Sequence, residues 1–218
     1  MTWLPYGVVN HFAHAWVASR QSPEPRFLLG AILPDLSAFL RIRLPEMPDS
    51  KVRAGIAFHH ATDRVFHALP AFRAYTRAGS TYLVRRGLTR GPARAAAHVG
   101  IELLLDAWLS RHRREALQHY RTALWHCDTL EFPLDTRDRT RISAFAQRLA
   151  IGDPATGLEA PGEIARRIAR TLEPRPRLRL PDAQLEPLND WLARAQDGMG
   201  AAPLALVHET LSRLDLVT

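Results

Sequence analysis

The chain has 218 residues, a net charge of +7 and one cysteine. This length is enough for one substantial hydrophobic core, and no Ser/Gly-rich linker divides it, so we expect a single domain over residues 1–218. The lone Cys127 excludes an internal disulfide and a multi-cysteine zinc site. Any bound metal would therefore have nitrogen and oxygen ligands.

The charge favours an acidic partner, either a protein, a phosphorylated metabolite or nucleic acid. Lys51 is the only lysine, and an arginine-rich composition is equally typical of a GC-rich genome, so charge alone does not choose among these partners. The sequence contains neither a signal-peptide pattern nor an uninterrupted apolar stretch of about 18 residues. We expect a cytoplasmic protein that does not insert into a membrane.

Apolar residues recur at helical spacing along nearly the whole chain, as at Ile142, Phe145 and Leu149, and no strand-like alternation interrupts them. Proline and glycine clusters separate these segments. We therefore predict an all-α, single-domain helical bundle. In chain order, the predicted helices cover residues 6–20, 26–40, 50–68, 70–77, 93–120, 137–150, 161–172, 183–196 and 203–214.

Two local features accompany these helices. Ser50 is suited to cap the helix predicted over residues 50–68. The basic segment 173–180 contains Pro174 and Pro176, which exclude a regular helix, so we predict an extended connection there.

The first two predicted helices carry polar residues in apolar surroundings. Asn10, His11 and His14 fall in the helix over residues 6–20, and Asp35 follows Pro34 in the next one. Taken alone, a histidine such as His14 is more often a core residue, and Asp35 can serve as a helix cap. Together with the residues of the later helices, they are candidate metal ligands.

Two histidine–carboxylate pairs have one-turn spacing: His59 with Asp63, and His98 with Glu102, which Asp106 follows one turn later. Residues four apart lie on the same helix face, with Cβ atoms roughly 5–6 Å apart, so each pair can bind a cation. A buried ion pair is the alternative for the first pair. Nine of the ten histidines lie at or before position 126. We place the metal-site motifs within residues 8–112 and expect a helical part over residues 113–218.

The motifs form an ordered series in the sequence: Asn10-x-x-Ala13-His14, Gly30-x-x-x-Pro34-Asp35, Ala54-Gly55-Ile56-x-x-His59-x-x-x-Asp63, and Glu102-x-x-x-Asp106-x-x-Leu109-Ser110-Arg111-His112. This series resembles the acyl carrier protein phosphodiesterases, also called holo-acyl-carrier-protein hydrolases. That family has an N-F-L-A-H start, a G-N-x-x-x-D turn, a G-I-x-x-H-x-x-x-D helix and a D-x-x-x-D-x-x-L-S-R-H helix in the same order. The resemblance covers about the first half of the chain.

The resemblance implies an all-α, divergent relative of the HD phosphohydrolases. It implies hydrolysis of the phosphodiester that joins 4′-phosphopantetheine to a serine of the carrier protein, with a divalent metal that activates water. Manganese or magnesium is the expected metal, and zinc or iron would also fit. Glu102 stands where the family has aspartate, which keeps a carboxylate as a ligand or base. The implied metal ligands are His14, Asp35, His59, Asp63 and Asp106.

Other residues receive expected roles around this centre. His60 or His112 would donate a proton to the departing serine alkoxide. Arg111, together with His112, would contact the phosphate, since arginine is a bidentate donor. Arg64 would steer an acidic carrier protein to the site, and Asn10 is a further substrate-binding candidate. The secondary site candidates are His11 and His98, and the histidines expected outside the site are His67, His119 and His126.

The chain also departs from the family pattern. Ala31 replaces the asparagine of the second motif, and His60 with Ala61 replaces a basic pair, so the substrate is either an acyl carrier protein or another acidic phosphodiester. The two histidine–carboxylate pairs also look like those of the zinc-dependent phospholipase C and single-strand nuclease group. A non-catalytic all-α binding protein is a further alternative. A nucleic-acid-binding protein is not favoured, because it would not explain the ordered histidine and aspartate series.

Overall fold

The computed structural model describes residues 11–200 and 202–215, and within these residues it contains helices and no strand. The predicted all-α class is therefore confirmed. The N-terminal half of the described chain forms five α-helices: α1 (His11–Gln21), α2 (Pro25–Leu40), α3 (Ser50–Ala68), α4 (Pro70–Arg85) and α5 (Arg90–His112).

The second half of the described chain forms further helices that pack around these five. They are α6 (Ala116–Trp125), the 3₁₀ turn η1 (His126–Thr129), α7 (Thr136–Ile151), α8 (Pro161–Leu172), the 3₁₀ turn η2 (Asp182–Gln184), α9 (Leu185–Met199) and α10 (Ala202–Arg213).

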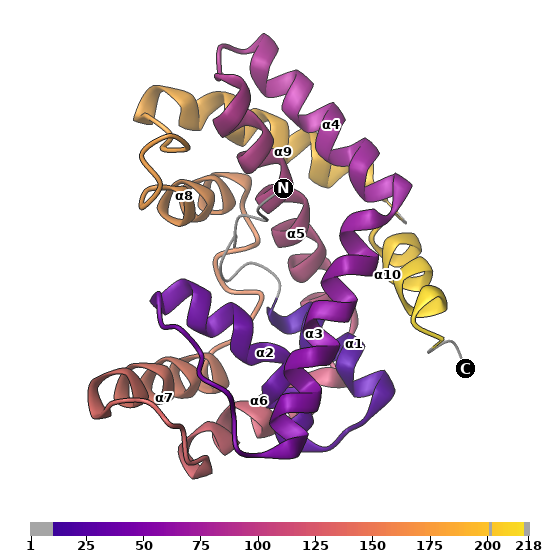
Figure 1. The fold of residues 1–218 in the computed structure, drawn as a ribbon. Coiled ribbons are helices and arrows are strands. Elements are labelled where there is room, and N and C mark those ends of the chain that lie inside the picture. Colours follow the sequence, from indigo (N-terminus) through magenta and orange to yellow (C-terminus); the bar gives the residue numbers. More distant parts are fainter. Residues whose placement is uncertain (1–10, 201, 216–218) are drawn as a thin grey trace.

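The helices form two groups (Figure 1). Helices α1, α2, α6 and α7 pack together at one end, and α4, α8 and α9 pack at the other. Helices α3 and α5 belong to both ends: α3 packs against α1, α2 and α4, while α5 packs against α1, α4 and α8. Helix α10 lies at the side of α3 and α5, away from α7. The two helices that carry the histidine–carboxylate pairs are therefore the central ones.

Side-chain caps define where several helices begin. The Asp49 carboxylate accepts the backbone N–H groups of Lys51 and Val52, at 2.8 and 3.0 Å, at the start of α3. Ser50 is the first residue of this helix, so the prediction that Ser50 caps it is wrong. Asp49 is the N-cap, because its carboxylate accepts two N–H groups that have no partner within the helix.

The helix predicted over residues 93–120 is two helices, because α5 ends at His112 and α6 begins at Ala116. No glycine or proline marks the break, and the apolar spacing runs through it. The chain turns there because α6 packs its buried residues, such as Leu117 and Tyr120, against α1, α2 and α7. In the same way, α4 continues to Arg85 rather than residue 77, since Leu83 is buried on its inner face.

The basic segment 173–180 is not extended as predicted. It begins with consecutive turns, in which the N–H of Arg175 donates to the carbonyl of Leu172 and that of Leu178 donates to Arg175. The prolines exclude an α-helix there but are compatible with tight turns.

Helices α2 and α3 cross with their backbones in contact. A Cβ atom on Gly30 would lie 2.2 Å from the carbonyl oxygen of Val52, and one on Gly55 would lie 2.1 Å from that of Phe27. Only glycine allows this approach. The crossing brings the carbonyl of Ala31 in α2 within 2.9 Å of Nδ1 of His59 in α3.

Candidate metal centre

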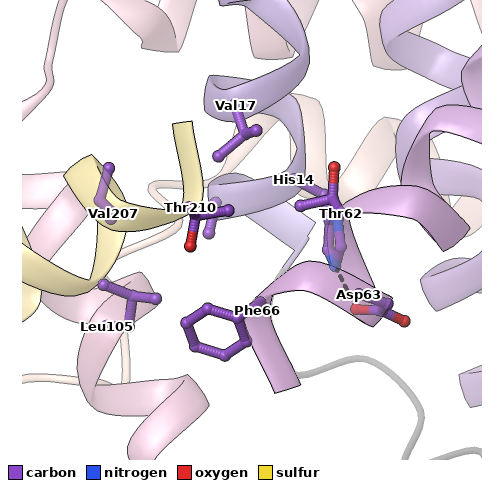
Figure 2. Close-up of a pocket in the computed structure, with 9 residues that line it drawn as sticks. His14, Val17, Thr62, Asp63, Phe66, Leu105, Val207 and Thr210 are labelled. Carbon is purple, nitrogen blue, oxygen red and sulfur yellow. Dashed lines mark ion pairs between the residues drawn. The ribbon is translucent and has the colours of Figure 1, made fainter. Parts of the chain in front are cut away.

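Two histidines and one aspartate converge between α1 and α3. Nε2 of His14 lies 3.2 Å from Oδ1 of Asp63, and Nε2 of His59 lies 3.4 Å from Oδ2 of the same carboxylate. One ligand atom from each residue can be chosen so that all three lie within 4.8 Å of one another. Figure 2 shows His14 of α1 and Asp63 of α3 pointing toward each other. We call His14, His59 and Asp63 the first cluster.

The hydrogen bond to Ala31 sets the protonation of His59. A carbonyl oxygen only accepts, so Nδ1 of His59 carries the proton and donates to it. In the neutral ring, Nε2 is then a lone-pair donor available to a metal ion, whereas in the doubly protonated ring Nε2–H donates to the Asp63 carboxylate. A histidine held in this way by a backbone carbonyl is the usual arrangement of a metal ligand.

The His14 and His59 rings are stacked, with centroids 4.0 Å apart. Two positive charges at this separation would repel each other. A single divalent cation beside Asp63 would instead satisfy both Nε2 lone pairs and the carboxylate together.

Asp63 is ionised and partly open to solvent. Burial raises the pKa of this carboxyl group, but hydrogen bonds from His14 and His59 outweigh burial and hold the pKa well below its usual range. Its side chain is 37% exposed, whereas the two histidines are 4% exposed. Asp63 is therefore the member of the first cluster that solvent or a ligand reaches.

Asp35 is buried in the interior of α2, so it does not cap a helix. Burial raises the pKa of its carboxyl group to about 7; the charge of His59 lowers the pKa, while the charges of Asp63, Glu102 and Asp106 raise it further. Its Oδ2 has no hydrogen-bond partner among the described residues. Asp35 therefore interacts electrostatically with other residues of the predicted site.

Asp106 joins α5 to the start of α1. Its Oδ1 accepts the backbone N–H of Ala13 at 2.7 Å, which is one of the N–H groups that the first turn of a helix leaves without an internal partner. This bond holds the turn that carries His14. Burial raises the pKa of Asp106 to about 7, and its Oδ2 has no hydrogen-bond partner among the described residues.

These residues fit a divalent cation. The ligand set combines imidazole nitrogen with carboxylate oxygen, which suits zinc, iron or manganese better than magnesium, since magnesium prefers oxygen ligands. Buried polar atoms are nearly always satisfied in native proteins, and a bound cation is one way to satisfy buried carboxylate oxygens. The unpartnered oxygens of Asp35 and Asp106 are two such atoms beside the first cluster.

A second cluster lies between α3 and α5 and consists of His67, His98 and Glu102. Nε2 of His67 lies 2.9 Å and Nε2 of His98 lies 3.1 Å from Oε1 of Glu102. Burial raises the pKa of Glu102, but the charge of His98 and the hydrogen bonds from both histidines lower the pKa to about 2. Glu102, predicted as a catalytic residue, is thus held by two histidines.

His67 is the residue that sequence reasoning missed, since it was expected outside the site. A signal was present, because the one-turn period of His59 and Asp63 continues to His67 in α3. The matching residues of α5 are His98, Glu102 and Asp106, at the same spacing.

The structure places two predicted residues beside the first cluster. His60 is exposed, and its ring meets that of His59 edge-on with centroids 5.2 Å apart. Burial lowers the pKa of His60, and the charge of His59 lowers it further. Arg64 is exposed and follows Asp63 directly in α3. Both residues therefore lie near the exposed side of Asp63.

The structure does not bring Arg111 and His112 to either cluster. His112 stacks on Trp108, with centroids 4.3 Å apart, and its Nδ1 donates to the Trp108 carbonyl at 2.8 Å. Arg111 donates from Nε to the carbonyl of Ala107. His112 is six positions after Asp106 in α5, which corresponds to a rise of about 9 Å along the helix axis. Asn10 lies outside the described residues.

The remaining histidines of this half lie outside both clusters. His11 is buried, and burial lowers its pKa to about 3, so it is neutral; its Nδ1 is 3.0 Å from the hydroxyl of Tyr120. His119 is exposed, and Nδ1 of His126 donates to the carbonyl of Thr122. Of the secondary candidates, His98 therefore belongs to a cluster, whereas His11 pairs with a tyrosine in the core.

A small cavity adjoins the first cluster. Its volume is about 20 Å³, which is enough for about one water molecule. Figure 2 shows Val207 and Thr210 of α10 on one side, with Phe66 and His14 on the other. The C-terminal helix thus lines the cavity beside the cluster. A larger ligand would have to approach from the exposed side of Asp63.

Comparisons of the chain with models of protein families, with curated proteins and with solved structures give no match. The family resemblance therefore rests on the sequence motifs alone. In the part of the chain that the structure describes, no helix is long and apolar enough to span a membrane.

Proposed function

We propose that the protein is a metal-dependent phosphodiester hydrolase of divergent HD type, with its centre at His14, His59 and Asp63. The observation that carries the proposal is the convergence of two imidazole nitrogens on one carboxylate, beside buried carboxylate oxygens without partners. The ordered motifs support the reaction class, because they resemble those of the acyl carrier protein phosphodiesterases.

The chain's own residues hold and orient the centre. The Ala31 carbonyl keeps the Nδ1 proton on His59, so that Nε2 is available as a ligand atom. Asp106 holds the first turn of α1, which carries His14. When bound, a divalent cation supplies positive charge beside the phosphate and lowers the pKa of a water molecule towards neutrality.

The substrate would approach the exposed side of α3. Arg64 can bind a non-bridging phosphate oxygen there, since arginine forms strong bonds to phosphate. His60 is favoured over His112 as the acid for the leaving alkoxide, because His60 adjoins His59 and His112 stacks on Trp108. Glu102 is engaged by two histidines, so no role in this step is assigned to it.

The substrate class is an acidic phosphodiester, with holo-acyl carrier protein as the leading candidate. The net charge of +7 supports an acidic partner, and the release of 4′-phosphopantetheine from its serine is the reaction of the family that the motifs resemble. Mass spectrometry of holo-acyl carrier protein incubated with the enzyme and metal would detect this loss.

A generic assay tests the reaction class without the natural partner. The metal-free chain is incubated with bis-nitrophenyl phosphate and Mn²⁺, Zn²⁺, Fe²⁺ or Mg²⁺ in turn. We expect cleavage that depends on added metal, is lost in His59→Ala and is kept in His119→Ala, whose side chain is exposed and outside both clusters. Absence of diester cleavage with every metal, or full activity in His59→Ala, would overturn the proposal.

A second candidate is a phosphodiesterase like the zinc-dependent phospholipase C and nuclease group. The nitrogen-rich ligands and the one-turn pair of His98 and Glu102 favour it. Cleavage of a phospholipid or of single-stranded DNA, with holo-acyl carrier protein left intact, would support this candidate. An aryl monoester cleaved in place of the diester would indicate a phosphatase.

A further inference from the structure

The second cluster has the geometry of a cation site. Nε2 of His67 in α3 and Nε2 of His98 in α5 both face Oε1 of Glu102, at 2.9 and 3.1 Å. One ligand atom from each of the three residues can be chosen so that all lie within 4.8 Å of one another. Two imidazoles and one carboxylate are a ligand set that binds zinc or iron and leaves positions open for solvent.

Aromatic packing holds these ligands in place. The ring of buried Phe72 lies against both imidazoles, with centroids 5.2 Å from His67 and 5.1 Å from His98. The side chains of His67 and His98 are 13% and 17% exposed, and that of Glu102 is 7% exposed. The ligands are therefore rigidly placed, yet the histidines keep an opening through which an ion can exchange.

Without a metal, the three side chains can form a hydrogen-bonded network in which Nε2–H groups of the histidines donate to Glu102. The His67 and His98 ring centroids are 4.8 Å apart, and a single carboxylate oxygen faces both nitrogens. A divalent cation would satisfy the carboxylate oxygen and both Nε2 lone pairs together.

The two clusters are neighbours that share no residue. Asp63 and His67 are one turn apart in α3, a rise of about 6 Å along the helix axis. No side chain of one cluster is a member of the other, so neither needs the other to be complete.

We propose that His67, His98 and Glu102 form a second site for a divalent transition-metal ion, which loads independently of the first cluster. This site stands apart from the proposed hydrolase activity, because its ligands are complete whether or not the first cluster is catalytic.

Metal stoichiometry tests the inference. The full chain is stripped with a chelator, loaded with Zn²⁺ and analysed by elemental mass spectrometry after removal of free ions. We expect two equivalents in the wild type and in His119→Ala. We expect one equivalent in His98→Ala, and one in His59→Ala. Circular dichroism of each variant checks that its helices are retained.

Co²⁺ loading adds a spectroscopic measurement that begins with the wild type. Titration of the metal-free chain should give two additive sets of visible absorption bands, and Glu102→Gln should weaken one set selectively. A wild type that saturates at one equivalent would overturn the inference, as would a folded His98→Ala that keeps two. Loss of diester cleavage with two equivalents still bound would count against the proposed function alone.

Discussion

Two buried carboxyl groups of the candidate site lack complete hydrogen bonding. Asp35 and Asp106 each have an oxygen without a partner among the described residues, and burial raises the pKa of each to about 7. Leaving a buried polar atom unsatisfied costs roughly 1–3 kcal/mol. Residues that lower stability in this way are found at functional sites, where a bound ligand offsets their cost.

The raised pKa of Asp35 predicts that the stabilities of the wild type and Asp35→Asn, both without metal, differ by an amount that depends on pH. Its pKa is about 7 in the folded chain and about 3.9 in an unfolded one, so only the folded state keeps the proton between these values. Its contribution to stability is therefore complete below about pH 4 and declines as the pH rises towards 7. Asp35→Asn, which stays neutral, should gain stability relative to the wild type across this window.

Urea unfolding in the presence of a chelator, at several pH values, measures this difference. Groups present in both proteins, such as His11, contribute equally to the two unfolding free energies and cancel when these are subtracted. A difference in unfolding free energy that is constant from pH 4 to 7 would contradict the assignment. The same substitution should weaken metal binding, because it removes a negative charge coupled to His59.

At the scale of elements, the crossing of α2 and α3 positions the first cluster. Contact of Gly30 with the backbone of α3, and of Gly55 with that of α2, brings the helices close enough for Ala31 to bind His59. Helix α5 is similarly fixed by Trp191 of α9, whose indole ring fills the space in which Gly100 has no side chain. Small residues at these two contacts thus let α3 and α5, which carry ligands, pack closely against α2 and α9.

Gly55→Ala tests the helix crossing. Its Cβ would lie 2.1 Å from the Phe27 carbonyl, so the helices must separate, which costs roughly 1–3 kcal/mol as overpacking does elsewhere. Metal affinity should fall as well, because the Ala31 carbonyl moves away from His59. Gly198→Ala in α9 is the matched control, since no atom lies within 4 Å of the added Cβ, and it should be neutral or stabilising. Equal effects of the two substitutions in chemical denaturation would refute this account.

The start of α3 gives a second test at this scale. Asp49→Ala should lower the unfolding free energy by about 1 kcal/mol, because the N–H groups of Lys51 and Val52 lose their acceptor. Ser50→Ala should have little effect, because Ser50 is exposed and already within the helix. Thermal unfolding of both variants compares the two caps, and a larger loss in Ser50→Ala would favour the cap predicted from the sequence.

At the scale of the whole molecule, the first cluster joins distant parts of the chain. Its ligands come from α1 and α3, the carboxyl groups beside it come from α2 and α5, and α10 lines the adjoining cavity with Val207 and Thr210. The half-buried Arg167 of α8 acts electrostatically on Asp106 and His11. The region after residue 112 thus contributes residues to the surroundings of the centre.

Metal binding should therefore stabilise the entire fold. An ion that binds the folded state alone adds about 2.7 kcal/mol at 100 times its Kd, which for a chain of this size raises the Tm by roughly 5–10 °C. Scanning fluorimetry with a chelator or with added Zn²⁺ measures the shift. The double variant His59→Ala/His98→Ala should lose it and His119→Ala should keep it; an undiminished shift in the double variant would place the ion elsewhere.

The sequence by itself determined the all-α class, the positions of most helices and the residues of the two one-turn pairs. These follow from local rules, since a helix repeats every 3.6 residues and any two residues four apart share a face. The same rule would have included His67, had its period been followed one turn further. For this reason, pairs such as His59 and Asp63 could be predicted from their spacing in the sequence.

Only the tertiary structure decided which of these residues meet. The contacts of His14 with Asp63, of Asp106 with the start of α1, and of Glu102 with His67 join helices that are far apart in sequence. The break between α5 and α6 likewise depends on what α6 packs against. Helix packing depends on side-chain shapes across the whole core, which no local periodicity encodes.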